Sequence, residues 1–185
     1  MFNDKYGLTE AVLSGRKTMT RRILKVTLTE YNTINLILNF DENLEANKLA
    51  IIKKYSQYQI GQVLAVAQSY KEIRDIIGDI HDGKSIKFSK GWNNKMFVRA
   101  DLMPHHIRIT NIKVERLRDI SNEDCIKEGI VEEDTPIDKG YSFYGTQGNW
   151  ETPREAFAFL IDKVSGKGTW KRNPWVFAYE FELID

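Results

Sequence analysis

The clearest pattern of apolar and polar positions lies near the end of the chain, after Pro174. Large apolar residues occupy every second position there: Trp175, Phe177, Tyr179, Phe181 and Leu183. A period of two is typical of a strand with one buried face. The pattern predicts a strand over 175–183, with Phe177 and Phe181 deep in the core.

Three further segments have strand character. Residues 63–67, after Gly61, form a short apolar run. Residues 96–117 are mostly strand-like, and their apolar positions change phase near Thr110-Asn111, which predicts a β-bulge or turn there. Residues 23–40 are rich in Ile, Leu, Val and Thr, and they predict a strand by composition more than by alternation.

Four segments carry helical signals. Apolar residues at helical spacing predict a helix from Leu8 that ends at Ser14-Gly15. Asp41 is a candidate cap for a helix over 41–55. Ser121 and Gly129 would bound a short helix. A capping box predicts a helix from residue 152, with its core face on Ala156, Phe157, Leu160, Ile161 and Val164.

Short strands with helices inserted among them predict an α+β fold, a small β-barrel with peripheral helices. No strand-helix-strand rhythm recurs and no glycine-rich phosphate loop is present, so a βαβ architecture is disfavoured. Residues 78–95 and 131–151 lack periodicity and are expected to be loops. The length of 185 residues favours a single domain over 1–185.

Composition narrows the functional classes. With 27 basic and 26 acidic side chains, the chain is nearly neutral, so any affinity for phosphates must come from local patches. The single cysteine, Cys125, fits a reducing compartment and suggests a buried apolar residue. No apolar run is typical of a secretion signal or a membrane span, so a cytoplasmic location is expected. No metal and no cofactor are expected, because His105 and His106 are adjacent on a predicted strand and would face opposite sides.

The richest chemical segment is the basic run over 15–22. It contains a glycine, two threonines, a lysine and three arginines: Gly15, Arg16, Lys17, Thr18, Thr20, Arg21 and Arg22. Such a run suits an anionic or polar ligand, with Lys17 as a candidate base and Thr20 as a candidate nucleophile. Neighbouring positive charges would lower the pKa of Lys17. The alternative is an ordinary solvated helix end.

Two other segments offer weaker candidates. Residues 170–175 interleave aromatic and basic side chains, so Trp170 and Arg172 could hold a nucleic acid, although a turn leading into a core strand explains them equally well. Glu128, just before Gly129, has by itself the features of a solvated helix end.

The run Gly15-Arg16-Lys17-Thr18-Met19-Thr20-Arg21-Arg22 resembles the marker G-x-K-x-x-T-x-R of the ASCH domain family, a branch of the PUA-like superfamily. Three further segments are similar to the family's pattern: Gly61-Gln62-Val63-Leu64, in which Gln62 replaces the usual acid, the stretch from Ile120 to Glu128-Gly129, and Asn173-Pro174-Trp175-Val176. The layout resembles the longer ASCH proteins of Bacteroides-type bacteria and their phages.

The resemblance implies a PUA-like barrel whose cleft is floored by residues 15–22 and binds RNA or a modified nucleoside. One bacterial branch of the family hydrolyses N4-acetylcytidine. In that branch Lys17, Thr20 and Glu128 would be base, nucleophile and proton donor to the leaving amine. Insertions near 27–60, 73–94 and 130–150 distinguish this chain from the compact enzymes.

The sequence favours the first of three functional classes and leaves the other two open as alternatives. The first is a reader of RNA or of a modified nucleoside, with Lys17, Arg21 and Arg22 on phosphates and Trp92, Trp150 or Trp170 stacked on a base. The second is an amidohydrolase acting on an acylated nucleoside. The third is a protein interaction module of phage origin. The sequence does not determine the oligomeric state.

Overall fold

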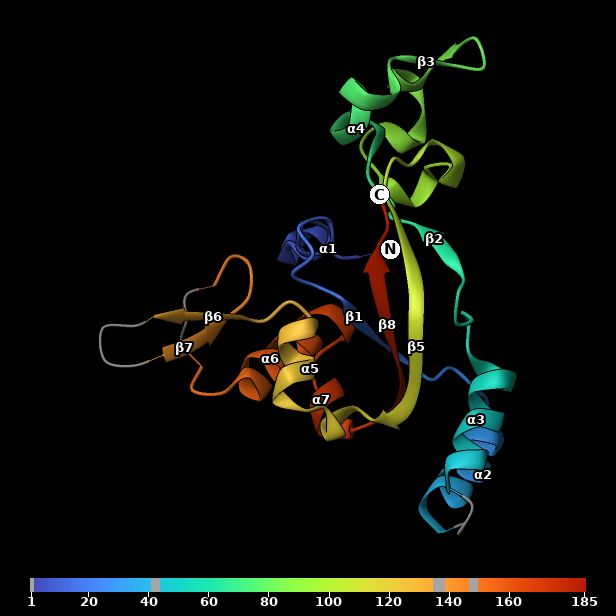
Figure 1. Cartoon of the computed structure of the whole chain (residues 1–185), viewed down its shortest axis with the longest axis vertical. Coiled ribbons are helices and arrows are strands. Elements are labelled where there is room, and N and C mark those ends of the chain that lie inside the picture. The colour runs from blue at the N-terminus through green and yellow to red at the C-terminus, as the bar shows by residue number, and fades with distance from the viewer. Residues whose placement is uncertain (1, 41–43, 135–138, 147–149) are drawn as a thin grey trace.

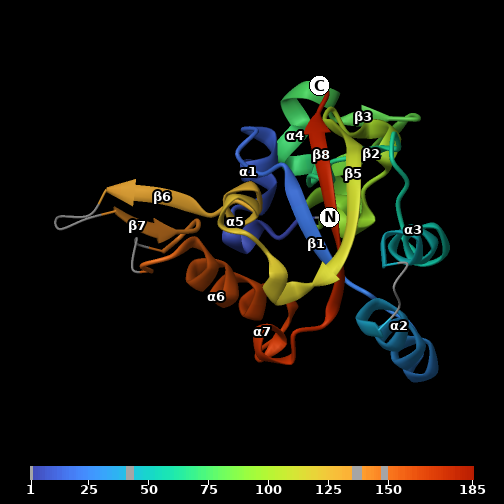
Figure 2. The same cartoon turned by 60° about the horizontal axis from the view of Figure 1, so that its bottom comes forward.

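A four-stranded antiparallel sheet is the centre of the molecule (Figure 1). The computed structural model describes residues 2–40, 44–134, 139–146 and 150–185. The strand order is β1-β8-β5-β2, and the strands are β1 (Met19–Ile23), β2 (Val63–Ala65), β5 (His106–Arg116) and β8 (Trp175–Leu183). The sheet curls, and helices flank it on both sides in Figures 1 and 2. The chain is thus α+β with a barrel-like sheet, as the sequence predicts.

Strand β8 is the central strand of the core, between β1 and β5. Phe177 and Phe181 are buried, as the alternation predicts. Val176 and Ala178, on the opposite face, are buried as well. Both faces of β8 are therefore covered, which the strict alternation of large and small residues did not indicate.

Strand β5 pairs with β8 along most of its length, and the register shifts between Ile109 and Asn111. This irregularity confirms the bulge predicted from the phase change. The strand begins at His106, later than residue 96, because residues 96–105 form short turns instead.

The predicted helices at both ends of the chain are confirmed. They are α1 (Leu8–Leu13), α5 (Asn122–Lys127) and α6 (Pro153–Ser165). Thr152 and Glu155 form the expected capping box of α6, and the Ser121 side chain caps α5. A short α7 (Thr169–Arg172) leads into β8. In both views α5 and α6 lie on the β1 side of the sheet.

The predicted strand over 23–40 is wrong, because residues 28–40 form a helix. This helix, α2 (Leu28–Phe40), is followed by α3 (Leu44–Tyr55), and in both views the two lie beyond the β5–β2 side of the sheet. Ile34 and Leu38, four residues apart, are buried on one side of α2. Packing of this stripe prevails over the β propensity of the segment. In α3, Ile51 is buried, whereas the proposed cap Asp41 lies outside the described residues.

Residues 66–105 form a layer of their own above the sheet (Figure 1). It contains α4 (Tyr70–Ile77), the strands β3 (Ile80–His81) and β4 (Lys84–Ser85), and several 3-10 turns. A second, smaller apolar cluster holds it together: Tyr70, Ile73, Ile86 and Met103. The expectation of a plain surface loop over 78–95 is therefore only partly met.

The segment 131–151, which was predicted to be a loop, contains a β-hairpin. Strands β6 (Val131–Asp134) and β7 (Lys139–Ser142) pair in antiparallel fashion and project beside α6. Four 3-10 turns lie in the layer over 66–105: Ile86–Phe88, Lys90–Trp92, Lys95–Phe97 and Ala100–Leu102. Two more among the described residues are Asp4–Tyr6 and Leu117–Asp119. Among the described residues, no helix is long and apolar enough to cross a membrane.

Replacing Phe181 by alanine is expected to lower the free energy of unfolding by roughly 3–5 kcal/mol, because the ring is buried and its removal leaves a cavity. The ring packs against Phe2, with centroids 5.7 Å apart. Urea denaturation followed by circular dichroism measures the change. Phe88→Ala is the matched control, since that ring is 91 % exposed. A loss at Phe181 as small as that of the control would contradict the assignment of Phe181 to the core.

Candidate active site

The turn before β1 carries Lys17 into the interior. Helix α1 ends at Ser14, and Gly15 has a φ of +73°, a left-handed conformation that favours glycine. The backbone N–H of Lys17 then donates to Ala11 O at 2.8 Å, and that of Thr18 to Lys127 O at 2.9 Å. These bonds join the turn to α1 and to the end of α5, which places Lys17 next to Glu128.

Lys17 and Glu128 form a buried ion pair, although 111 residues separate them in the chain. The Lys17 Nζ donates to Glu128 Oε2 at 2.6 Å and to the Glu128 backbone oxygen at 2.7 Å. Lys17 is 2 % and Glu128 4 % exposed. The structure therefore brings together these two predicted residues, and it places Glu128 inside the protein rather than in solvent.

The surroundings of Lys17 disfavour its charged form. Burial is the largest influence and lowers the pKa of Lys17 below its ordinary value of 10.5, although the Glu128 carboxylate opposes the shift. Arg22 and Arg21 lower it further. The sequence correctly predicted a lowered pKa for Lys17. The prediction named neighbouring positive charges as the cause, whereas burial is the larger cause.

Arg21 points from β1 into a cluster of carboxylates. Its Nε and Nη2 donate to Glu115 Oε1 at 2.9 and 2.7 Å, and Nη2 also donates to Asp124 Oδ2 at 2.8 Å. Its Nη1 donates to Glu128 Oε1 at 3.1 Å and to the Met19 sulfur at 3.0 Å. A guanidinium has five N–H groups, and this set of contacts engages all of them.

This arrangement differs from the expectation that Arg21 would hold a phosphate. The residue is 6 % exposed, and its partners satisfy its donors. Although it borders the cleft, its position is that of a support for Glu128.

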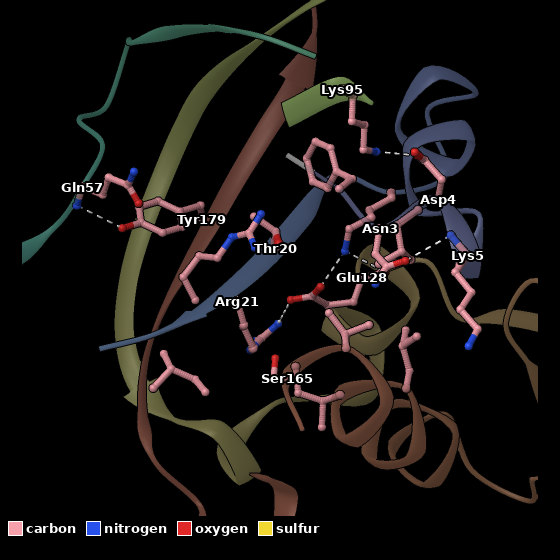
Figure 3. A pocket seen from close by; sticks show the side chains of 18 of the residues that line it. Asn3, Asp4, Lys5, Thr20, Arg21, Gln57, Lys95, Glu128, Ser165 and Tyr179 are labelled. Carbon is pink, nitrogen blue, oxygen red and sulfur yellow. Dashed lines mark hydrogen bonds and ion pairs between the residues drawn. The ribbon is translucent and has the colours of Figure 1, made fainter. Parts of the chain in front are cut away.

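Thr20 and Arg22 project from the other face of β1. Thr20 pairs with Tyr179 of β8, and Arg22 pairs with Phe177. Paired residues share a face of the sheet, so this face carries the threonine hydroxyl beside two aromatic rings. The side-chain hydroxyl of Thr20 makes no hydrogen bond with any described residue; in Figure 3 Thr20 lies between Tyr179 and Glu128.

A cleft of about 1010 Å³ contains all three candidate catalytic residues, Lys17, Thr20 and Glu128. Helix α6 contributes an apolar wall with Phe157, Leu160 and Ile161. Two further segments supply walls of the cleft. The end of α3 and the turn after it contribute Tyr55, Gln57 and Tyr58, and the layer over 66–105 contributes Ser69, Glu72, Asn93, Asn94, Lys95 and Met96.

Hydrogen bonds at both ends of the cleft hold these two segments in place. The Tyr179 hydroxyl accepts from the Gln57 backbone N–H at 3.3 Å, so the strand opposite Thr20 anchors the 55–58 segment (Figure 3). At the other end, Lys95 Nζ donates to Asp4 Oδ1 at 2.5 Å and to Thr9 Oγ1 at 2.8 Å. The segment 55–58 and the layer over 66–105 are therefore part of the cleft wall.

The remaining predicted ligand residues lie away from the cleft lining. Gly15 forms the turn, and Arg16 is exposed and paired with Glu10. Trp170 packs edge-on against Phe157, and Arg172 donates to Thr169 Oγ1 at 2.8 Å. The three tryptophans considered for base stacking do not line it either: Trp92, Trp150 and Trp170.

Cys125 is fully buried, and burial raises the pKa of its thiol to about 12, in line with an apolar structural residue. Within the part of the chain that the structure describes, no group of three or more His, Cys, Asp or Glu side chains is arranged to hold a metal ion.

The sequence reading missed the supporting network of Glu115 and Asp124. The available signal was the alternation along residues 19–23, since a strand there requires Arg21 and Thr20 to face opposite sides. If Thr20 faces the cleft, the Arg21 side chain must lie on the opposite face of the strand, where a buried guanidinium needs acidic partners.

No family model matches the chain, and no curated protein matches it. Among solved structures, the chain is similar to a crystal structure of a protein from Enterococcus faecalis V583 placed in the family model DUF984. The identity is 15 %, the TM-score is 0.37, and the match covers 96 % of this chain and 67 % of the other. A similarity at this level carries no assignment of function.

Proposed function

We propose that the protein is an amidohydrolase of the PUA-like ASCH type that removes an acyl group from a modified nucleoside. The observation that carries this proposal is the buried Lys17–Glu128 pair at a large cleft that also contains the Thr20 hydroxyl. A buried ion pair contributes little net stability, because desolvation offsets the attraction. Buried titratable groups at a cleft are, in contrast, typical of catalytic sites.

The hydrogen bonds of Lys17 suit a base. A neutral amine has two N–H groups and one lone pair, and Lys17 makes two hydrogen bonds, both to Glu128. The lone pair is then left for the proton of a nucleophile. The lowered pKa of Lys17 favours this neutral form.

The proposed reaction has two stages. Thr20 Oγ1 attacks the amide carbonyl carbon while Lys17 takes the hydroxyl proton. The C–N bond then breaks, and Glu128, 2.6 Å from Lys17 Nζ, relays a proton to the leaving nitrogen. Water next attacks the threonine ester, with Lys17 again as base, and releases the carboxylic acid. One amide and one water thus give one acid and one amine, and Thr20 is regenerated.

The fold and the cleft support a nucleoside as the ligand. The curled sheet with its basic segment at the cleft is compatible with a PUA-like barrel, and aromatic side chains at the cleft are suited to stack on a base. A volume of about 1010 Å³ is at the upper end for small-molecule sites. We therefore expect a nucleotide or a short single strand to be a better substrate than a free nucleoside.

The test is a turnover assay of the purified protein on N4-acetylcytidine, its 5′-monophosphate and a short RNA that contains one N4-acetylcytidine. Acetate release and deacetylated product are measured together. We expect turnover, with a larger kcat/KM for the monophosphate or the RNA. Absence of acetate release from all three would count against the hydrolase.

A reader of RNA is the second candidate, because basic side chains line the same cleft: Lys5, Arg22, Lys25 and Lys95. A reader would bind the acetylated RNA without turnover, and its affinity would fall with salt as counterions are taken up again. Binding measured at two salt concentrations separates these outcomes. If the protein shows neither turnover nor salt-dependent binding, both candidates are rejected and the protein interaction module is the class that remains.

A further inference from the structure

The residue directly behind the proposed catalytic pair is Arg21, which is not one of the four marker positions Gly15, Lys17, Thr20 and Arg22. We infer that Arg21 is a positioning residue, which orients the Glu128 carboxylate toward Lys17. The inference rests on the proposed function for its catalytic meaning, but the geometry that carries it is independent of any substrate.

Both carboxylate oxygens of Glu128 are held. Oε2 accepts from Lys17 Nζ at 2.6 Å, and Oε1 accepts from Arg21 Nη1 at 3.1 Å. With one N–H donor on each oxygen, the carboxylate cannot rotate without losing its hydrogen bond to Lys17 or to Arg21. Arg21 thus fixes the plane in which Glu128 meets Lys17.

Arg21 is itself anchored from two elements. Glu115 of β5 holds Nε and Nη2, and Asp124 of α5 holds Nη2. Its side chain is fully buried. A planar guanidinium held at both ends is a rigid support, which a lysine ammonium at the same position would not reproduce.

Arg21 also supplies charge. Without Arg21, no second positive charge would lie beside Glu128. The carboxylate would then stabilise the protonated Lys17 ammonium more strongly, and the pKa of Lys17 would be higher. The positive charge of Arg21 satisfies part of the negative charge of Glu128 and repels a proton on Lys17. Arg21 therefore favours the neutral amine that the proposed reaction needs.

Other charged groups around this site also influence the titration of Lys17. The positive charge of Arg22, on β1, also lowers the pKa of Lys17. Lys113 of β5 lies 3.8 Å from Asp124. Helix α1 brings Glu10, which is paired with Arg16. The N-terminal segment brings Asp4 and Lys5 to the cleft, and the layer over 66–105 brings Lys95.

The experiment compares Arg21→Met and Arg21→Lys with wild type. The protein is labelled with ¹³C at the lysine ε carbon, and the Lys17 signal is assigned by its disappearance in Lys17→Met. In Arg21→Met we expect Lys17 to titrate at a pH higher by about one unit or more. The acid limb of kcat/KM should move the same way. Arg21→Lys should restore most of the titration shift, but with reduced kcat, because its ammonium lacks the fork.

Arg116→Met is the matched control. Arg116 is also a partly buried arginine, stacked 4.4 Å from the Trp175 ring centroid, but it does not line the cleft. Its loss should destabilise the protein and leave the Lys17 titration unchanged. A folded Arg21→Met protein in which Lys17 titrates as in wild type would overturn the inference. A shifted titration in a protein without hydrolase activity would support the positioning of Glu128 and reject the proposed function.

Asp124→Asn provides a second test in case Arg21→Met does not fold. This change removes a negative charge bonded to Arg21 with little change in shape, so Lys17 should titrate at lower pH than in wild type. An unchanged or raised value would argue against electrostatic coupling through Arg21.

Discussion

Replacing Lys17 by methionine is expected to reduce hydrolysis of the acetylated nucleotide by about 100- to 10,000-fold, the usual contribution of a general base. In wild type the neutral amine is the active form, so kcat/KM should rise with pH through a pKa below 10.5, because burial lowers the pKa of Lys17. The residual rate of Lys17→Met should lack this rise. Initial rates measured between pH 5 and 10 give both quantities.

Lys127→Met is the control for the loss of a nearby lysine. Lys127 is in the last turn of α5, is partly exposed, and pairs with Glu180 at 3.3 Å. It does not line the cleft, so its replacement should leave the rate and the pH profile unchanged. Wild-type turnover in Lys17→Met would remove Lys17 from the mechanism.

Local sequence patterns predicted those elements whose register and ends are determined by nearby residues. The alternation over 175–183 gives β8, the Thr152–Glu155 box gives α6, and Ser121 with Gly129 gives α5. In each case the caps or the period lie within the element itself.

The missed elements depend on partners that are distant in the sequence. Residues 28–40 have strand-like composition, but Ile34 and Leu38 of the helix they form belong to the main core. The layer over 66–105 is held by its own cluster, which joins residues as far apart as Tyr70 and Met103. The local spacing of apolar residues cannot predict contacts between residues so far apart in the sequence.

The candidate site was predicted in part. The basic run gave Lys17 and Thr20 from the residue types alone, whereas Glu128 followed only from a family resemblance. The Arg21 network could not be predicted, because its bonds span 94 to 107 residues. Basic residues in one short run thus have different roles: Arg16 pairs at the surface, Lys17 and Arg21 are buried, and Arg22 lines the cleft.

The predicted role of Thr20 rests on its place at the cleft and on a side-chain hydroxyl that makes no hydrogen bond with described residues. Thr20→Val is expected to lower turnover by roughly four orders of magnitude or more, as loss of a covalent nucleophile does. Binding should persist, because valine has nearly the shape of threonine and is well accommodated in a strand. Turnover assays and calorimetric titration with the nucleotide measure the two effects separately.

Two control variants distinguish loss of the nucleophilic hydroxyl from a change in side-chain shape. Thr20→Ser keeps a hydroxyl and should retain measurable turnover. Thr18→Val makes the same chemical change two residues earlier, at a position that does not line the cleft, and should behave as wild type. Mass spectrometry of wild type quenched during turnover should detect an acyl group on Thr20, since the ester is an intermediate. If Thr20→Val hydrolyses the substrate at the wild-type rate, water must attack the amide directly, and only Lys17 and Glu128 of the proposed catalytic residues would remain.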